Sequence, residues 1–109
     1  MMKFMLIIRE NIYTERTEEA LKEVIQLHRN WYAQLASSGH AIDGNGLSEK
    51  GFLLEQKNNE IIIGSIRDTS EGIGGYYVIH AKDMDEAITL AKECPTFTMG
   101  DKIEVRQIM

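Results

Sequence analysis

The amino-acid sequence predicts an α+β fold built from two β-α-β units with a β-hairpin inserted between them. Two segments of the 109-residue chain show the three- and four-residue spacing of apolar residues that is typical of helices. Each segment lies between short runs rich in β-forming residues, and two further such runs flank the tripeptide "KNN" in the middle of the chain. The length fits a single domain over residues 1–109 with one hydrophobic core.

The first unit begins with the apolar run "KFMLIIR", residues 3–9, which predicts a central strand covered on both faces. Thr17 is the predicted N-cap of the helix that follows, and Gly39 is its predicted stop. The apolar stripe of this helix consists of Leu21, Val24, Ile25, His28, Trp31, Tyr32 and Leu35. His28 is unusual, because an aliphatic residue is expected at its position in the stripe.

The middle of the chain predicts a short strand and then a hairpin. Residues 40–47 predict a strand that runs into a glycine-rich bend. The segment "GFLLEQKNNEIIIGSI" predicts two antiparallel strands near 51–56 and 60–66. After the loop "RDTSEGIGG", the run "YYVIH" predicts a strand with alternating faces: Tyr76, Val78 and His80 on one, Tyr77 and Ile79 on the other.

The second helix has signals at both ends. Asp83 and Glu86 form a predicted capping box, and Pro95 is the predicted stop. The apolar stripe of this helix consists of Met84, Ala87, Ile88, Ala91 and Cys94. The closing segment "DKIEVRQI" predicts a strand with Ile103 and Val105 on one face and Glu104 and Arg106 on the other.

This order of elements is the ferredoxin-like split β-α-β pattern with an inserted hairpin. In such a fold both helices cover one side of an antiparallel sheet and leave its other face open. The run "YYVI" supplies large apolar groups to both faces of one strand, so the open face needs a cover. We expect a homodimer in which two open sheet faces meet.

Composition narrows the class of protein. The formal net charge of -5 leaves no basic surplus to neutralise phosphates, so a nucleic-acid partner is not expected. The lone Cys94 excludes an intramolecular disulfide and favours a cytoplasmic location. The apolar start "MMKFMLII" lacks the features of a signal peptide and is far shorter than the roughly 20 apolar residues that span a bilayer, so no membrane partner is expected.

Two long segments, "GGYYVIHAKDMDEAITLAKECP" and "GDKIEVRQIM", carry a family resemblance. Together with the start "MKFMLIIRE", they make the chain similar to the YCII-related proteins, especially their DGPF-type branch. The matching positions are Glu71, Gly74, Gly75, Tyr76, Tyr77, Asp83, Glu86, Ala87, Ala91, Cys94, Pro95, Glu104, Val105 and Arg106. The motif Asp-Gly-Pro-Phe-Ala-Glu that names the branch is absent, and the chain is several residues shorter at that place.

The resemblance implies a ferredoxin-like subunit that dimerises as an α/β barrel. Structurally similar relatives include small-molecule enzymes such as muconolactone isomerases and barrel monooxygenases. A His–Asp pair has been suggested as the working unit of the family, although most of its members have no assigned reaction.

His28 is the predicted acid–base residue, because it lies on the inner face of the first helix and an imidazole suits proton transfer near neutral pH. The alternative interpretation is a partly buried histidine that serves packing alone. Asp68 and Glu71, in the loop before the glycines, are the predicted partner carboxylates that orient the imidazole. Asp43 is a third candidate, although its place before Gly44 also suits a turn residue.

Other kinds of site do not fit the sequence. The runs "GNG" and "GIGG" do not open into a helix after a strand, so they are not phosphate-binding loops. His28, His40 and His80 lack the short spacing of metal ligands, so neither a metal nor a cofactor is expected. The predicted lining of a small-molecule pocket is Trp31, Tyr32 and Tyr77.

Two functional classes remain open. The first is a small-molecule enzyme or binding protein in which His28 works with a carboxylate. The second is a non-catalytic dimeric module for interaction or regulation. A pocket lined by Trp31 and His28, with a carboxylate in hydrogen-bond reach, indicates the first class. A filled core with His28 bonded to the backbone indicates the second.

Overall fold

The computed structural model of the chain describes residues 1–10, 16–66 and 72–109. The elements follow in the order β1 (Met2–Glu10), α1 (Glu18–Ser37), β2 (Ala41–Gly46), β3 (Phe52–Lys57), β4 (Glu60–Ser65), β5 (Gly72–Ala81), α2 (Met84–Ala91), the 3-10 helix η2 (Phe97–Met99) and β6 (Lys102–Gln107). No helix in these ranges has the length and apolar character needed to cross a bilayer.

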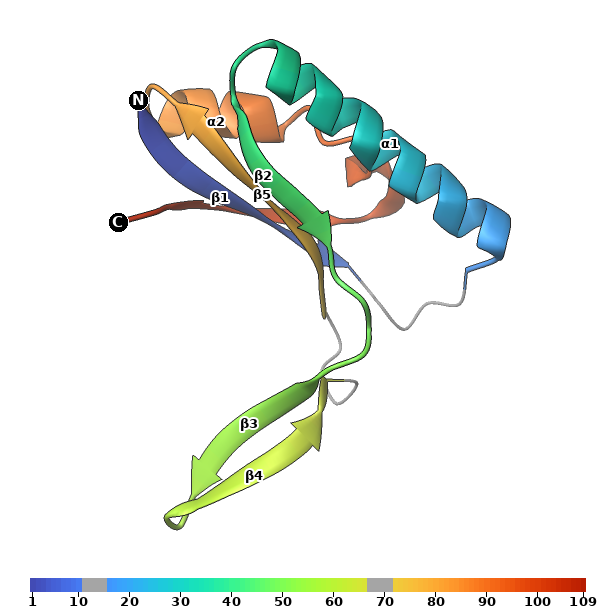
Figure 1. Ribbon diagram of the computed structural model, residues 1–109, viewed down its shortest axis with the longest axis vertical. Coiled ribbons are helices and arrows are strands. Elements are labelled where there is room, and N and C mark those ends of the chain that lie inside the picture. The colour runs from blue at the N-terminus through green and yellow to red at the C-terminus, as the bar shows by residue number, and fades with distance from the viewer. Residues whose placement is uncertain (11–15, 67–71) are drawn as a thin grey trace.

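Four strands form one antiparallel sheet in the order β2-β5-β1-β6. The strands β1 and β5 are therefore central, and the helices α1 and α2 lie against one side of the sheet (Figure 1). This arrangement confirms the predicted α+β fold and is compatible with the ferredoxin-like pattern.

The hydrophobic core lies between the sheet and the two helices. Alternate residues of β1, namely Phe4, Leu6 and Ile8, point into it and are at most 3% exposed. The intervening Met5 and Ile7 lie on the open face and are only half-buried. The prediction that β1 is covered on both faces is therefore wrong for this single chain, because the helices pack on one face alone.

The helix α1 begins and ends as predicted, but its apolar stripe is not wholly buried. The hydroxyl of Thr17 accepts a hydrogen bond from the Ala20 N–H at 3.1 Å, and Gly39 has the positive φ of 80° that favours glycine after a helix. Leu21 and Ile25 nevertheless remain 47% and 42% exposed. A 20-residue helix is about 30 Å long, and the N-terminal half of α1 extends beyond the strands (Figure 1).

The helix α2 has the predicted cap but a different stop. The Asp83 carboxylate accepts the Glu86 N–H at 2.8 Å, and the Glu86 carboxylate accepts the Lys82 N–H at 3.0 Å. The helix ends at Ala91, so Pro95 is not its immediate stop. The chain then passes through η2 and turns into β6 at Gly100, whose φ is 91°.

The strands β3 and β4 form a separate two-stranded sheet, which we call the arm (residues 52–65). Asn58 and Asn59 both have positive φ, 51° and 65°, as a two-residue hairpin turn requires. The arm projects away from the four-stranded sheet and from both helices (Figure 1). The predicted hairpin is confirmed, with strand ends that differ from the prediction by one residue.

Candidate functional site

His28 lies at the centre of a hydrogen-bonded group between α1, β5 and the segment that follows α2. Its Nδ1 is 2.6 Å from the hydroxyl oxygen of Tyr77, and its Nε2 is 3.2 Å from the hydroxyl oxygen of Thr96. Tyr77 points toward the helices from β5, and Thr96 is 1% exposed. Both ring nitrogens of His28 therefore engage hydroxyl groups, and each hydroxyl is able to donate or to accept.

Aromatic rings pack together beside His28, although neither of the two cavities described below is lined by Trp31, Tyr32 or Tyr77. The Trp31 ring packs edge-on against Tyr77 with centroids 4.7 Å apart, and the Tyr32 ring stacks on Tyr77 at 6.3 Å. Gly44, opposite Tyr77 in β2, makes room for these rings. A Cβ there would lie 2.9 Å from the Tyr77 ring and 3.1 Å from the Tyr32 ring. The glycine of "DGNG" thus allows the tyrosines to pack closely.

The buried carboxylate in this region is Asp101, which sequence reasoning missed. It follows Gly100 directly, is 7% exposed, and its N–H donates to the Thr96 carbonyl at 3.4 Å. Its Oδ2 is buried and has no hydrogen-bond partner among the described residues. Burying a carboxylate oxygen without a hydrogen-bond partner is energetically costly, so its presence here points to a functional role.

Burial and nearby charges set the protonation of the site. Burial lowers the pKa of His28, while the negative charge of Asp101 raises it and the positive charge of Arg16 lowers it. Burial also raises the pKa of the Tyr77 hydroxyl, which keeps it protonated. At neutral pH the site therefore holds a neutral imidazole between two protonated hydroxyls, with an anionic side chain close enough to favour its protonation.

Glu10 and Arg16 are two further charged groups in this region. Burial raises the pKa of Glu10, the charge of Arg16 lowers it and that of Asp101 raises it. The Glu10 carboxylate lies 3.6 Å from the Arg16 guanidinium. A Cβ at Gly74 would overlap the Glu10 side chain, so this glycine leaves the space that Glu10 occupies.

The predicted partner carboxylates have different outcomes. Asp68 and Glu71 lie outside the described residues. Asp43 accepts hydrogen bonds from the Tyr76 hydroxyl at 3.3 Å and from the Gly44 N–H at 2.9 Å. Because successive residues of a strand point to opposite faces, Tyr76 holds Asp43 on the face away from Tyr77. The structure therefore does not bring Asp43 to His28.

The other histidines lie apart from this site. His40 Nδ1 is bonded to the His80 carbonyl at 2.8 Å and is 4.0 Å from the Glu86 carboxylate. Within residues 1–10, 16–66 and 72–109, no three side chains of the types His, Cys, Asp and Glu form a group that could hold a metal ion.

Thr96 and Asp101 carry little signal in the sequence. Thr96 is 68 residues from His28 along the chain, and the two meet only because α2 and η2 fold back beside α1. The sequence feature that marks this place is the pair "GD" just before the last strand. Its glycine indicates a turn, and the aspartate follows that turn directly.

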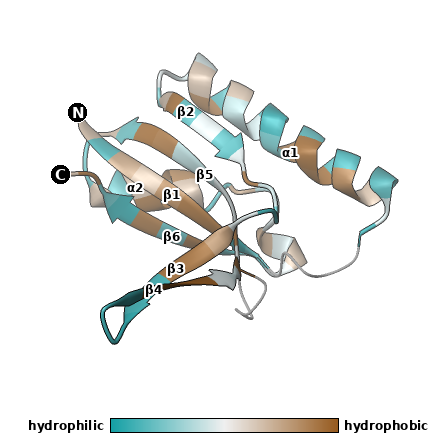
Figure 2. Ribbon diagram, turned by 60° about the horizontal axis from the view of Figure 1, so that its bottom comes forward, coloured by the Kyte–Doolittle hydropathy of each residue, from teal (hydrophilic) through white to brown (hydrophobic). Residues whose placement is uncertain are grey.

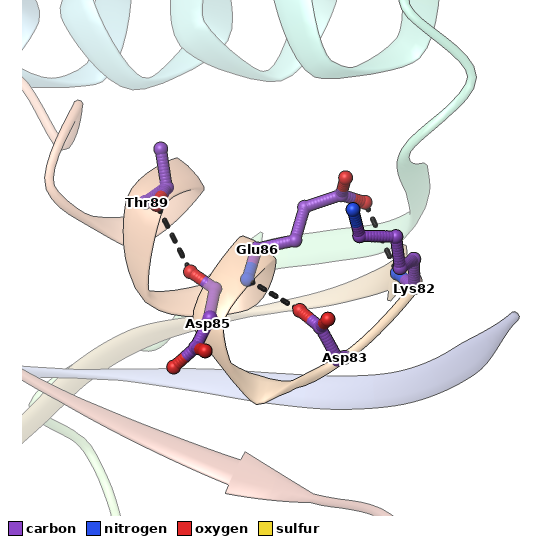
Figure 3. A pocket seen from close by; sticks show the side chains of 5 residues that line it. All are labelled: Lys82, Asp83, Asp85, Glu86 and Thr89. Carbon is purple, nitrogen blue, oxygen red and sulfur yellow. Dashed lines mark hydrogen bonds between the residues drawn. The ribbon is translucent and has the colours of Figure 1, made fainter.

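Two surface cavities lie elsewhere. One of about 390 Å³ is lined by Lys82, Asp83, Asp85, Glu86 and Thr89 (Figure 3). Several of its polar groups are engaged at α2 itself: the Asp83 carboxylate caps the helix, and the Thr89 hydroxyl donates to the Asp85 carbonyl at 2.9 Å. The other, of about 480 Å³, lies at the base of the arm.

Comparison with known proteins gives the family. Residues 2–109 match the YCII-related domain, so the match takes in every strand and helix described above. No curated protein matches the chain. On the extent of this match, the chain belongs to the YCII-related domain family.

Proposed function

We propose that the protein is a small-molecule enzyme or binding protein in which His28 is the acid–base group. The observation that carries the proposal is the His28 imidazole, whose Nδ1 lies 2.6 Å from the Tyr77 hydroxyl oxygen, together with the buried Asp101 carboxylate, whose charge raises the pKa of His28 and whose Oδ2 has no partner among the described residues. A neutral imidazole accepts a proton, and a nearby carboxylate stabilises the imidazolium that forms.

Each residue has a part in this proposal. His28 accepts or supplies the proton. The hydroxyls of Tyr77 and Thr96 fix the plane of the imidazole. Because each hydroxyl is able to donate or to accept, it remains hydrogen-bonded whichever ring nitrogen carries the proton. Asp101 acts by charge, because its effect on the pKa of His28 favours the protonated ring. Trp31 and Tyr32 shield the group from water.

A specific observation supports the second functional class. Both ring nitrogens of His28 have partners within the protein, as expected of a histidine that serves packing. In that case the chain is a non-catalytic interaction module.

A ligand screen by thermal shift separates the two classes. Wild type, His28→Asn and the control His40→Asn are compared with a set of small organic acids and their esters. A ligand of the native state raises the melting temperature by mass action, so a ligand of this site should stabilise wild type and His40→Asn but not His28→Asn. Equal shifts in all three proteins would remove His28 from the binding site.

We also propose that the chain belongs to the DGPF-type branch, has a cytoplasmic location and forms a homodimer. The "GGYY" run and the closing "EVRQI" support membership of the DGPF-type branch. The buried Cys94 supports a cytoplasmic location. The open sheet face supports a homodimer of the α/β-barrel type, because half-buried apolar residues occupy its middle: Met5 opposite Val78, and Ile7 opposite Tyr76.

A further inference from the structure

One face of the arm carries four large apolar side chains, together with Gln56 and Ser65. In the register of β3 and β4, Leu54 lies opposite Ile63, and Phe52 and Ile61 lie on the same face. We call these four residues the apolar face of the arm. Their exposed fractions are 73% for Phe52, 61% for Leu54, 61% for Ile61 and 65% for Ile63. The apolar face of the arm is thus open to water in the single chain.

The other face of the arm is more polar. It carries Glu60 and the ion pair of Glu55 with Lys57 at 3.5 Å. Its two large apolar residues, Leu53 and Ile62, are less exposed, at 43% and 44%. This alternation is the pattern of a strand pair with one face in water and one face against a core. A lone two-stranded hairpin is only marginally stable in water, so the arm needs a surface to pack on.

We propose that the apolar face of the arm packs on a second copy of this chain. The four side chains expose on the order of 450 Å² of apolar surface in each copy. In a two-fold dimer both arms and the surfaces under them are buried, about 1,800 Å² in total, which is the size of a stable protein interface. The arm is large enough to hold a dimer together.

The position of the arm favours a second copy over other occupants. The cavity of about 480 Å³ at its base is lined by Phe52 and Leu53 of the arm and by Arg9 and Ile73 of the sheet. Arg9 and Ile73 are paired on the open sheet face, so the arm and that face form one continuous surface. Figure 2 shows the hydrophobic arm standing beside the end of this sheet. A second sheet placed on the open face lies within reach of the arm, and two-fold symmetry makes the contact reciprocal.

This inference rests on the proposed homodimer and is independent of the role of His28. It adds a second contact to the dimer. The two sheet faces could meet without the arm, and we infer that the arm also packs on the partner. The net charge of -5 argues against the alternative that the apolar face of the arm enters an anionic membrane.

The test compares two double variants of the same residue types. Leu54→Thr/Ile63→Thr alters the apolar face of the arm, and Leu53→Thr/Ile62→Thr alters the opposite face. Threonine preserves the preference for strands in both. Sedimentation equilibrium over a dilution series should give a dimer for wild type. The first variant should raise the dimer dissociation constant about a hundredfold, and the second less than about fivefold.

Each result is decisive. A dimer with an unchanged dissociation constant in Leu54→Thr/Ile63→Thr would overturn the arm inference and leave the sheet-face dimer standing. A wild-type monomer at all concentrations would overturn both, while the ligand screen on His28 would stand. Binding of monomeric wild type to vesicles of anionic lipid, lost in the first variant, would assign the apolar face of the arm to membranes instead.

A second measurement covers the case in which the first variant does not fold. In wild type, the backbone amides of β3 and β4 should exchange with deuterium more slowly at high than at low protein concentration. Exchange that does not depend on concentration would equally overturn the inference.

Discussion

The sheet core and the arm are two strand regions that are both rich in large apolar residues but have opposite surroundings. In β1, alternate apolar residues are buried: Phe4 and Leu6 are 0% exposed. In the arm, alternate apolar residues such as Leu54 and Ile63 are more than 60% exposed. The difference is the presence of a cover, since α1 and α2 pack over the sheet, whereas no helix among the described residues packs over the arm (Figure 1). A continuous apolar run thus predicts that a strand needs cover, and the tertiary arrangement decides which face receives it.

The largest effect expected from this comparison concerns two leucines. Leu6→Ala should lower the free energy of unfolding by about 2–5 kcal/mol, because it leaves a cavity in a closely packed core. Leu54→Ala should change it by less than about 0.5 kcal/mol when measured on the monomer, because Leu54 is already in water. Urea denaturation at low protein concentration measures both. A loss of similar size in the two variants would mean that the arm packs on its own chain.

Alanine substitutions at two glycines, Gly44 and Gly51, are expected to change the stability of the fold by an intermediate amount. Gly44→Ala places a Cβ 2.9 Å from the Tyr77 ring, so it should destabilise the fold by about 1–3 kcal/mol. At Gly51, beside the arm, the nearest atom would be 3.5 Å away, so Gly51→Ala should be within about 0.5 kcal/mol of wild type. Melting temperatures of the two variants provide the measurement. A neutral Gly44→Ala would show that the rings of Tyr32 and Tyr77 move apart freely.

The smallest expected effect is a dependence of the free energy of unfolding on pH, and it arises from His28 beneath the helices. Because burial lowers the pKa of His28, the unfolded chain binds a proton that the folded chain does not once the pH falls below about 6.5, the ordinary value. The free energy of unfolding should therefore decrease as the pH falls through this window. His28→Asn should show a weaker decrease, and an NMR titration of the His28 ring locates the folded midpoint. An unchanged slope in His28→Asn would exclude this origin.

Glu10 should act in the opposite direction at lower pH. Burial raises its pKa above the ordinary value of 4.5, so its contribution to stability is present below that pH and is lost as the pH rises through the folded pKa. Glu10→Gln should remove this contribution, as measured by the free energy of unfolding over a pH series. The slope assigned to Glu10 should be opposite in sign to the slope assigned to His28.

Most of the fold could be predicted from the sequence, because strands and helices leave local patterns. The Thr17 and Asp83 caps and the alternation in β5 are all confirmed. The exposure of Leu21 and Ile25 could not be predicted, since helical spacing does not show where the sheet beneath the helix ends. The sequence likewise does not show that the helices cover only one face of β1.

The candidate site was only partly predictable. His28 stands out because a polar ring interrupts an apolar stripe, and Trp31 and Tyr32 belong to the same stripe. Thr96 and Asp101 approach it across more than 60 residues of chain, so no local spacing marks them. For Asp43, a register irregularity between Ala41 and Asp43 in the pairing of β2 with β5 precedes the residue. A prediction from simple alternation does not anticipate such an irregularity.

The turn at Asn58 and Asn59 has a consequence for the order of folding. It closes the pair of Lys57 with Glu60 across two residues, whereas the pair of Leu6 with Val105 joins opposite ends of the chain. Hairpins of this kind form in about 1–10 μs, and pairings between distant residues form more slowly. Pairing within the arm is therefore expected to begin before the pairing of β1 with β6, although the isolated hairpin is only marginally stable. Lys57 and Glu60 place a positive and a negative charge beside the turn, and charges next to apolar strands disfavour aggregation.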